Sequence, residues 1–146
     1  MKIKYLFFSL LLSVSFSTFG QDNKLSNIAN DPNKADFKFE TEEYSFGKIM
    51  QGESVTYDFK FTNTGSEPLI ISKAEGSCGC TVPIWPKEPI MKGQTAGVKV
   101  TFNSTGKLGV QDKTVTLTSN AATNPMIIHI KGTVEKPTLP SESKTK

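Results

Sequence analysis

One stretch of the sequence alternates apolar and polar side chains so regularly that it fits a β-strand. Its apolar positions are every second residue: Val55, Tyr57, Phe59 and Phe61. Successive side chains of a strand point to opposite faces of a sheet, so the stretch has one aromatic-rich inner face and one polar outer face. The pattern predicts a half-buried strand.

The same period of two recurs along the chain, and no window has the apolar spacing of an amphipathic helix. Further strands are predicted around residues 37–39, 44–46, 69–71, 98–102, 115–117 and 126–130. β-Branched residues crowd these windows, and Gly, Pro and Asn turns separate them. Strands of this length and spacing predict an all-β fold, an immunoglobulin-like antiparallel β-sandwich of about seven strands, with a small barrel as the alternative.

Both ends of the chain have a composition unlike that of this domain. Residues 1–20 carry two lysines and then an uncharged apolar run of ~14 residues that ends in small side chains. This is typical of a cleavable signal peptide and is too short to span a bilayer. Residues 21–36 are predicted to be a flexible linker and residues 135–146 a disordered tail, because neither segment has enough apolar surface to bury. The domain is therefore predicted over residues 37–134.

The charged residues argue against a nucleic-acid partner. All 17 basic residues are Lys, whereas bidentate contacts to guanine and phosphate are typical of Arg. The formal net charge is +3 and falls to +1 once Lys2 and Lys4 are set aside with the signal peptide, leaving 15 basic against 14 acidic residues. No strongly charged partner is implied.

Two cysteines separated by one glycine are the most unusual local feature. Cys78 and Cys80 lie in a Gly-rich turn after the strand near Ile71. Three interpretations compete. The first is a structural disulfide, because an exported protein meets an oxidising compartment and Gly79 lets the chain bend enough to close a short ring. The second is a thiol-redox site, although the Cys-x-x-Cys spacing at a helix start is missing. The third is a Cu(I) site held by two thiolates.

Other residues have both a functional and a structural interpretation. Trp85, between Pro83 and Pro86, is either an exposed contact aromatic or a cap on one end of the sandwich beside the cysteine turn. His129 falls on the outer face of its strand, where a solvated side chain is expected. The acidic residues at positions 40, 42 and 43 have no nucleophile or His at a motif spacing, so a solvated edge is expected there. No catalytic residue, resident cofactor or metal site is predicted.

Several short segments form a distinctive combination. They are Phe46-Gly47-Lys48-Ile49, Gly52, Phe61-Thr62-Asn63-Thr64-Gly65, Pro68-Leu69-Ile70-Ile71 and Ser77-Cys78-Gly79-Cys80-Thr81. Together they resemble the bacterial family known as domain of unknown function 1573, over residues 37–134. The Asn-Thr-Gly and Cys-Gly-Cys-Thr pieces are the specific parts of this resemblance. It implies an exported immunoglobulin-like domain, related in architecture to sperm-protein and chaperone-type sandwiches, and it implies no established catalytic activity.

Two functions follow as hypotheses. The first is an exported, non-enzymatic module, periplasmic or extracellular, that binds a protein or another component of the cell envelope and has no transmembrane segment after signal cleavage. The alternative is a thiol-redox or copper-handling protein that acts through Cys78 and Cys80.

Overall fold

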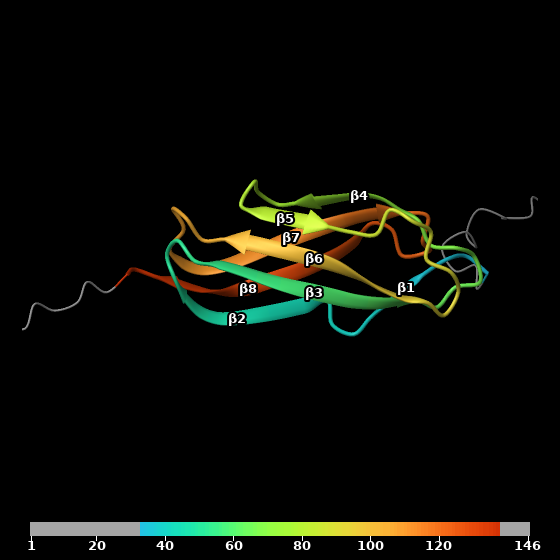
Figure 1. The fold of residues 1–146 in the computed structure, drawn as a ribbon, viewed down its shortest axis with the longest axis horizontal. Coiled ribbons are helices and arrows are strands. Elements are labelled where there is room, and N and C mark those ends of the chain that lie inside the picture. Colours follow the sequence, from blue (N-terminus) through green and yellow to red (C-terminus); the bar gives the residue numbers. More distant parts are fainter. Residues whose placement is uncertain (1–32, 138–146) are drawn as a thin grey trace, which may run out of the picture.

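Eight β-strands form two four-stranded sheets that pack face to face (Figure 1). The computed structural model describes residues 33–137, which contain no helix. The strands are β1 (Phe37–Phe39), β2 (Glu43–Met50), β3 (Ser54–Asn63), β4 (Ile71–Gly76), β5 (Thr81–Ile84), β6 (Thr95–Asn103), β7 (Gly109–Ser119) and β8 (Met126–Glu135). Sheet A has the order β1-β3-β6-β5 and sheet B the order β2-β8-β7-β4. The predicted all-β sandwich is therefore confirmed, with eight strands rather than seven.

The core lies between the two sheets, where the inner residues of the alternating strands meet. Phe59 and Phe61 of β3 and Val100 of β6 are fully buried from sheet A. Leu117 of β7 and Ile130 of β8 cover them from sheet B and are equally buried. The period of two that defined the strands in the sequence thus also identified the buried face of each one.

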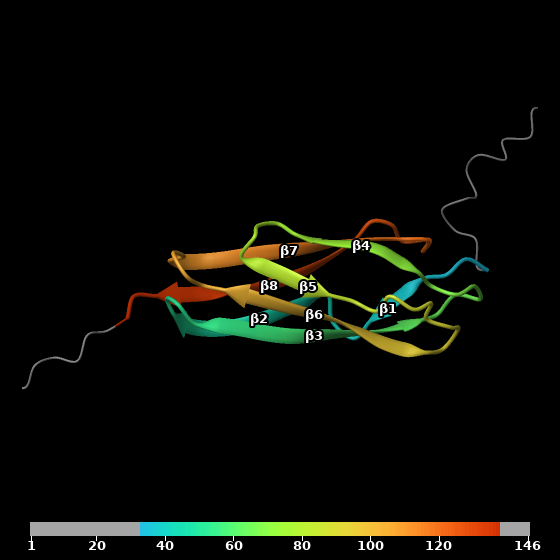
Figure 2. The ribbon, with the colours of Figure 1, turned by 45° about the horizontal axis from the view of Figure 1, so that its top comes forward.

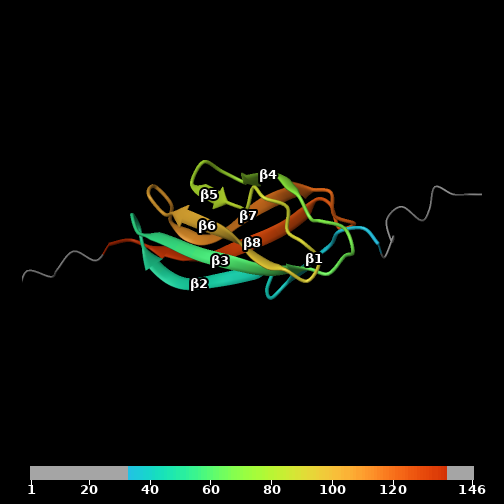
Figure 3. The same ribbon diagram turned by 45° about the vertical axis from the view of Figure 1, so that its right-hand side comes forward.

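The chain changes sheet near its start. β1 pairs antiparallel with the end of β3 in sheet A, and β2 then pairs with β8 in sheet B. The β2–β8 pair is parallel, so sheet B is mixed and only sheet A is purely antiparallel. The parallel pair follows from the change of sheet. β2 keeps the chain direction of β1, but its neighbour is β8 instead of β3. Figure 3 shows β2 and β3 side by side on the same flank of the sandwich.

Three local details differ from the sequence-based expectation. β5 was not predicted, because it is four residues long and contains Pro83. The strand expected at residues 69–71 begins only at Ile71, whereas Leu69 forms an isolated bridge with Ile90. The packed domain also begins before residue 37, because Ala35 is fully buried and its carbonyl accepts a hydrogen bond from the Ala122 N–H at 2.8 Å.

Several expectations fall on residues outside the described part of the chain. These are the signal peptide at 1–20, the linker up to residue 32 and the tail from residue 138. Within residues 33–137 no helix is long and apolar enough to cross a membrane.

Candidate functional site: the Cys78–Cys80 corner

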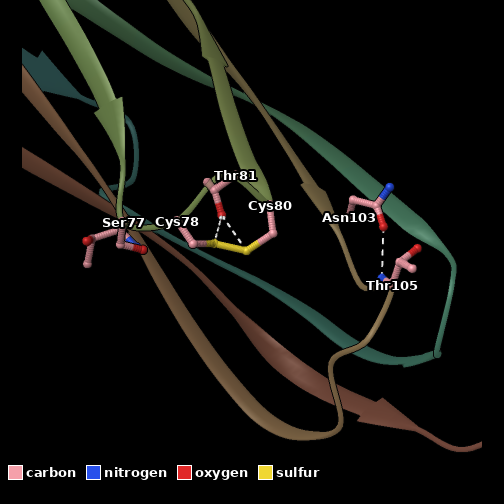
Figure 4. The surroundings of a disulfide bond; sticks show 7 residues. Ser77, Cys78, Cys80, Thr81, Asn103 and Thr105 are labelled. Atoms are coloured by element: carbon pink, nitrogen blue, oxygen red, sulfur yellow. Dashed lines mark hydrogen bonds between the residues drawn. A yellow bond between two sulfur atoms is a disulfide. The ribbon is translucent and has the colours of Figure 1, made fainter.

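The cysteine turn carries the chain from one sheet to the other. β4 is an edge strand of sheet B and ends at Gly76. β5 is an edge strand of sheet A and begins at Thr81. The Ser77 N–H donates to the Thr114 carbonyl of β7 at 2.8 Å, which fixes the start of the turn. The Asn103 N–H donates to the Cys80 carbonyl at 2.9 Å, which fixes its end to sheet A. Figure 4 shows the two cysteines of the turn with the Thr81 side chain directed at their sulfur atoms. The turn therefore joins two edge strands at one corner of the sandwich (Figure 2).

The structure joins Cys78 and Cys80 by a disulfide, with their Cα atoms 5.2 Å apart. The Thr81 hydroxyl lies 3.6 Å from the Cys78 sulfur and 3.8 Å from the Cys80 sulfur. The Thr81 N–H donates to the Cys78 carbonyl at 3.1 Å. The disulfide and this backbone hydrogen bond therefore both close the turn that starts at Cys78. Both cysteines are half-buried. A short bridge across a turn that is already hydrogen-bonded fixes the shape of the corner.

We expect the double variant Cys78→Ser/Cys80→Ser to keep the fold and to lose roughly 1.6 kcal/mol of unfolding free energy. This is the chain-entropy value for closing a loop of three residues, and it is small because so short a loop restricts the unfolded chain little. Urea denaturation of the variant and the oxidised parent, compared at equal m values, measures the difference. The reduced and alkylated parent is the control. A loss above about 4 kcal/mol would show that the bridge, rather than the core, is a principal source of stability.

Trp85 closes the far end of the same flank. Its indole Nε1–H donates to the Ile71 carbonyl, at the start of β4, at 3.2 Å. The ring is half-buried against the core, and the ammonium of Lys87 lies 3.1 Å from its centroid. These contacts describe a side chain that reaches from the end of β5 to the start of β4, at the opposite end of β5 from the cysteine turn.

β5 itself presents two large apolar side chains to solvent. Val82 is 55% exposed and Ile84 is 64% exposed, on either side of Pro83. Both lie on the outer face of sheet A, because the inward residue Thr81 is buried and side chains alternate along the strand. The disulfide corner precedes this strand directly, and Trp85 follows it.

The outer face of sheet B carries an ion-pair network instead. The imidazole Nδ1 of His129 lies 2.9 Å from the Asp112 carboxylate, and the Lys131 ammonium lies 2.6 Å from Glu43. The hydrogen bond with His129 lowers the pKa of Asp112, and the nearby positive charge of Lys131 adds to this effect. His129 thus points outward as expected, but it is paired with Asp112 rather than solvated alone. In the part of the chain that the structure describes, no group of three or more His, Cys, Asp or Glu side chains could hold a metal ion.

The arrangement of strands defines an immunoglobulin-like β-sandwich, and solved structures share this fold. A protein of unknown function from Porphyromonas gingivalis W83 is similar with a TM-score of 0.60 at 13% identity, over 70% of this chain and 49% of that one. The ASH/PapD-like domain 7 of human CEP192 has a TM-score of 0.57 at 9% identity, over 92% of this chain and 100% of the domain. At these identities the likeness shows the fold alone.

Sequence similarity then places the chain in a family. Residues 37–134 match the family described as protein of unknown function (DUF1573), and the chain belongs to it. This confirms the resemblance seen in the sequence, over the same residues. No curated protein matches the sequence. The chain spans about half the length of the Porphyromonas gingivalis structure.

Proposed function

We propose that this protein is an exported, non-enzymatic module that binds another protein or a component of the cell envelope. The observation that carries the proposal is the pair of exposed side chains Val82 and Ile84 on a strand held at both ends. Exposed apolar side chains on a rigid support are the usual centre of a protein–protein contact, because burying them gains free energy without first ordering the surface.

The disulfide corner supports this surface. The Cys78–Cys80 bridge and the Cys80–Asn103 hydrogen bond hold the first residue of β5, and the Trp85–Ile71 hydrogen bond holds the residue after its end. We propose that the bridge is present in the exported protein, where its role is to hold β5 in place. Export itself rests on the sequence of residues 1–20.

A photo-crosslinking amino acid placed at Ile84 tests the binding surface in cells of the native host. We expect a discrete crosslinked product in the envelope fraction, and we expect it to disappear when Val82→Lys is added, because a lysine would place a charge in the apolar contact. The matched control is the same crosslinker at Ile127, which is 45% exposed on the outer face of the other sheet. No product at Ile84, or the same products from both positions, would contradict the proposal.

The alternative function uses the two sulfur atoms directly. Both cysteines are half-buried at a corner of the molecule, so a reductant or a Cu(I) donor can approach them. Mass spectrometry of protein from the native envelope, with and without alkylation, separates the two functions. An unalkylated protein lacking two hydrogen atoms supports the structural bridge. Free thiols that take up one Cu(I), with uptake lost in Cys78→Ser, would support metal handling.

A further inference from the structure

The first half of β3 has an uncovered edge. β1 pairs only with Phe61–Asn63 of β3, and the last hydrogen bond between them runs from the Glu40 N–H to the Lys60 carbonyl at 3.0 Å. The chain then leaves for sheet B, where the Glu42 carbonyl accepts from the His129 N–H. β3 begins at Ser54, so within residues 33–137 no strand of sheet A lies beside its residues 54–59 on this side.

Alternation along β3 identifies the backbone groups at that edge. Odd-numbered residues face β6, because the Asn63 N–H donates to the Gln94 carbonyl and the Glu53 carbonyl accepts from Ser104. Even-numbered residues face the opposite way, as the Glu40–Lys60 bond shows. The N–H and C=O groups of Thr56 and Asp58 therefore point outward, and neither residue has a backbone partner on that side within residues 33–137.

The edges on the opposite flank are protected at several positions. Along the free side of β5, Pro83 has no N–H and the Thr81 N–H is used by the Cys78 carbonyl. The edge of β4 is covered at both of its ends. At Gly76 a Cβ would overlap the Thr81 carbonyl, and the Ile71 carbonyl accepts from the Trp85 indole. Folded proteins block exposed edges by such devices, because an open edge templates pairing with another chain.

The neighbouring edge of β2 is also protected. The Thr41 hydroxyl donates to the Glu43 carbonyl at 2.7 Å and lies 3.3 Å from the Glu43 N–H. Further along, Gly47 has a positive φ of 69°, and the register with β8 shifts between Ser45 and Lys48. A bulge of this kind bends an edge away from regular pairing. Within residues 33–137, no bulge, proline or side-chain cap lies along the outward backbone groups of Thr56 and Asp58. The charged side chains there are Asp58 and Lys60, which pair with each other at 2.6 Å.

The side chains beside the open edge are apolar. At its end lie two acidic side chains that are unpaired within the described residues, whereas the Lys60 ammonium there is paired with Asp58 at 2.6 Å. Five half-buried residues of β2 and β3 pack against the core and are termed the aromatic seam: Tyr44, Phe46, Ile49, Val55 and Tyr57. The rings of Tyr44 and Tyr57 stack with centroids 3.9 Å apart. Where β1 leaves β3, Glu40 and Glu42 are exposed and form no ion pair within residues 33–137.

We propose that the edge of β3 at Thr56 and Asp58 binds an extended segment of a partner protein as an added strand of sheet A. The segment runs antiparallel to β3, in the same direction as β1, and pairs with β3 beyond the point where β1 stops at Glu40. Its residues opposite Val55 and Tyr57 are apolar, because they face the aromatic seam. Its N-terminal end carries Lys or Arg, since that end lies beside Glu40 and Glu42. This inference rests on the proposed function and adds a second contact, remote from β5.

A synthetic peptide tests the site directly: one lysine followed by alternating valine and threonine residues. Added to the full exported protein, it should slow amide hydrogen exchange at Thr56 and Asp58 at least ~10-fold, because the new strand bonds these groups. The same peptide with alternate N-methylated amides should not bind, since it lacks the donors. The N-methylated peptide tests the hydrogen bonds without changing the protein.

Proline variants locate the edge. Thr56→Pro removes an N–H that has no internal partner, so the fold should survive while peptide affinity falls at least ~10-fold. Ser45→Pro makes the same change on the free edge of β2, and Thr56→Val removes only the hydroxyl that bonds Thr101. Both controls should bind within about twofold of the parent. The melting temperature of each variant shows whether it is folded.

Three outcomes would overturn the inference. They are no peptide binding at millimolar concentration, equal binding by Thr56→Pro, and protection of β2 amides in place of Thr56 and Asp58. A parent that dimerises in sedimentation, with the dimer lost in Thr56→Pro and no peptide bound, would assign the edge to a second copy of this chain instead. The crosslink at Ile84 is a separate readout, so it can persist when this inference fails.

Discussion

The Asn63→Ala variant should lose about 3 kcal/mol of unfolding free energy, because one buried side chain bonds four backbone groups from three parts of the chain. Asn63 is fully buried at the end of β3. Its Nδ2 donates to the carbonyls of Glu67 and Ile90 at 2.8 and 2.9 Å. Its Oδ1 accepts from the Gly65 N–H at 3.0 Å and the Asp36 N–H at 3.3 Å. Alanine would leave these groups without their partner in the interior.

The matched control is Asn120→Ala, the same change at an exposed position. Asn120 also bridges two backbone groups, since it donates to the Pro68 carbonyl and accepts from the Ile70 N–H. Water can replace the amide at this site, so the expected loss is about 1 kcal/mol. Urea denaturation at unchanged m value measures both. Equal losses for the two variants would show that the burial of Asn63 does not increase the contribution of its hydrogen bonds to the free energy of unfolding.

Asn63 also shows how far the sequence reaches. The Asn-Thr-Gly segment reads as a turn that ends a strand, and it is one. The sequence does not show that the Asn63 side chain bonds the Ile90 carbonyl, because Ile90 lies 27 residues away in the chain. The sequence also does not show why residue 65 is a glycine. A Cβ at this position would overlap the backbone of Lys34, which comes close only in the folded chain.

Strands with regular alternation were predictable because periodicity is a local property. Phe59, Phe61 and Val100 were placed on inner faces and are buried. Pairing is not local, so the parallel contact of β2 with β8 and the uncovered start of β3 could not be inferred. β5 escaped prediction because Pro83 interrupts a four-residue strand that depends on β6 for its hydrogen bonds.

The candidate site was predictable in composition but not in geometry. The spacing of Cys78 and Cys80 marked the turn as special and allowed a disulfide among three interpretations. What holds the turn comes from distant strands: Thr114 lies 37 residues from Ser77, and Asn103 contacts Cys80 from the end of β6. The role of the turn as a crossover between sheets therefore appears only in the fold.

Glycine substitutions in that crossover should have opposite outcomes three residues apart. We expect Gly76→Ala to lose about 3 kcal/mol of unfolding free energy, because a Cβ at this position would overlap the backbone carbonyl of Thr81. The two edge strands would have to separate at the corner. The backbone cannot yield easily there, since the Thr81 N–H and the Ser77 N–H are both held by hydrogen bonds.

Gly79→Ala is the matched control within the same turn. A Cβ at Gly79 meets nothing within 4 Å, and the residue has no positive φ, so the change should be neutral or stabilise by up to about 0.5 kcal/mol by restricting the unfolded chain. Denaturation of both variants with the disulfide intact gives the effect of the added Cβ on the free energy of unfolding, because the contribution of the disulfide is the same in both. If Gly76→Ala is as stable as Gly79→Ala, the close approach of β4 and β5 does not constrain the corner. The placement of Val82 and Ile84 would then rest on the pairing of β5 with β6 and on the contacts of Cys80 and Trp85, without a contribution from the approach to β4.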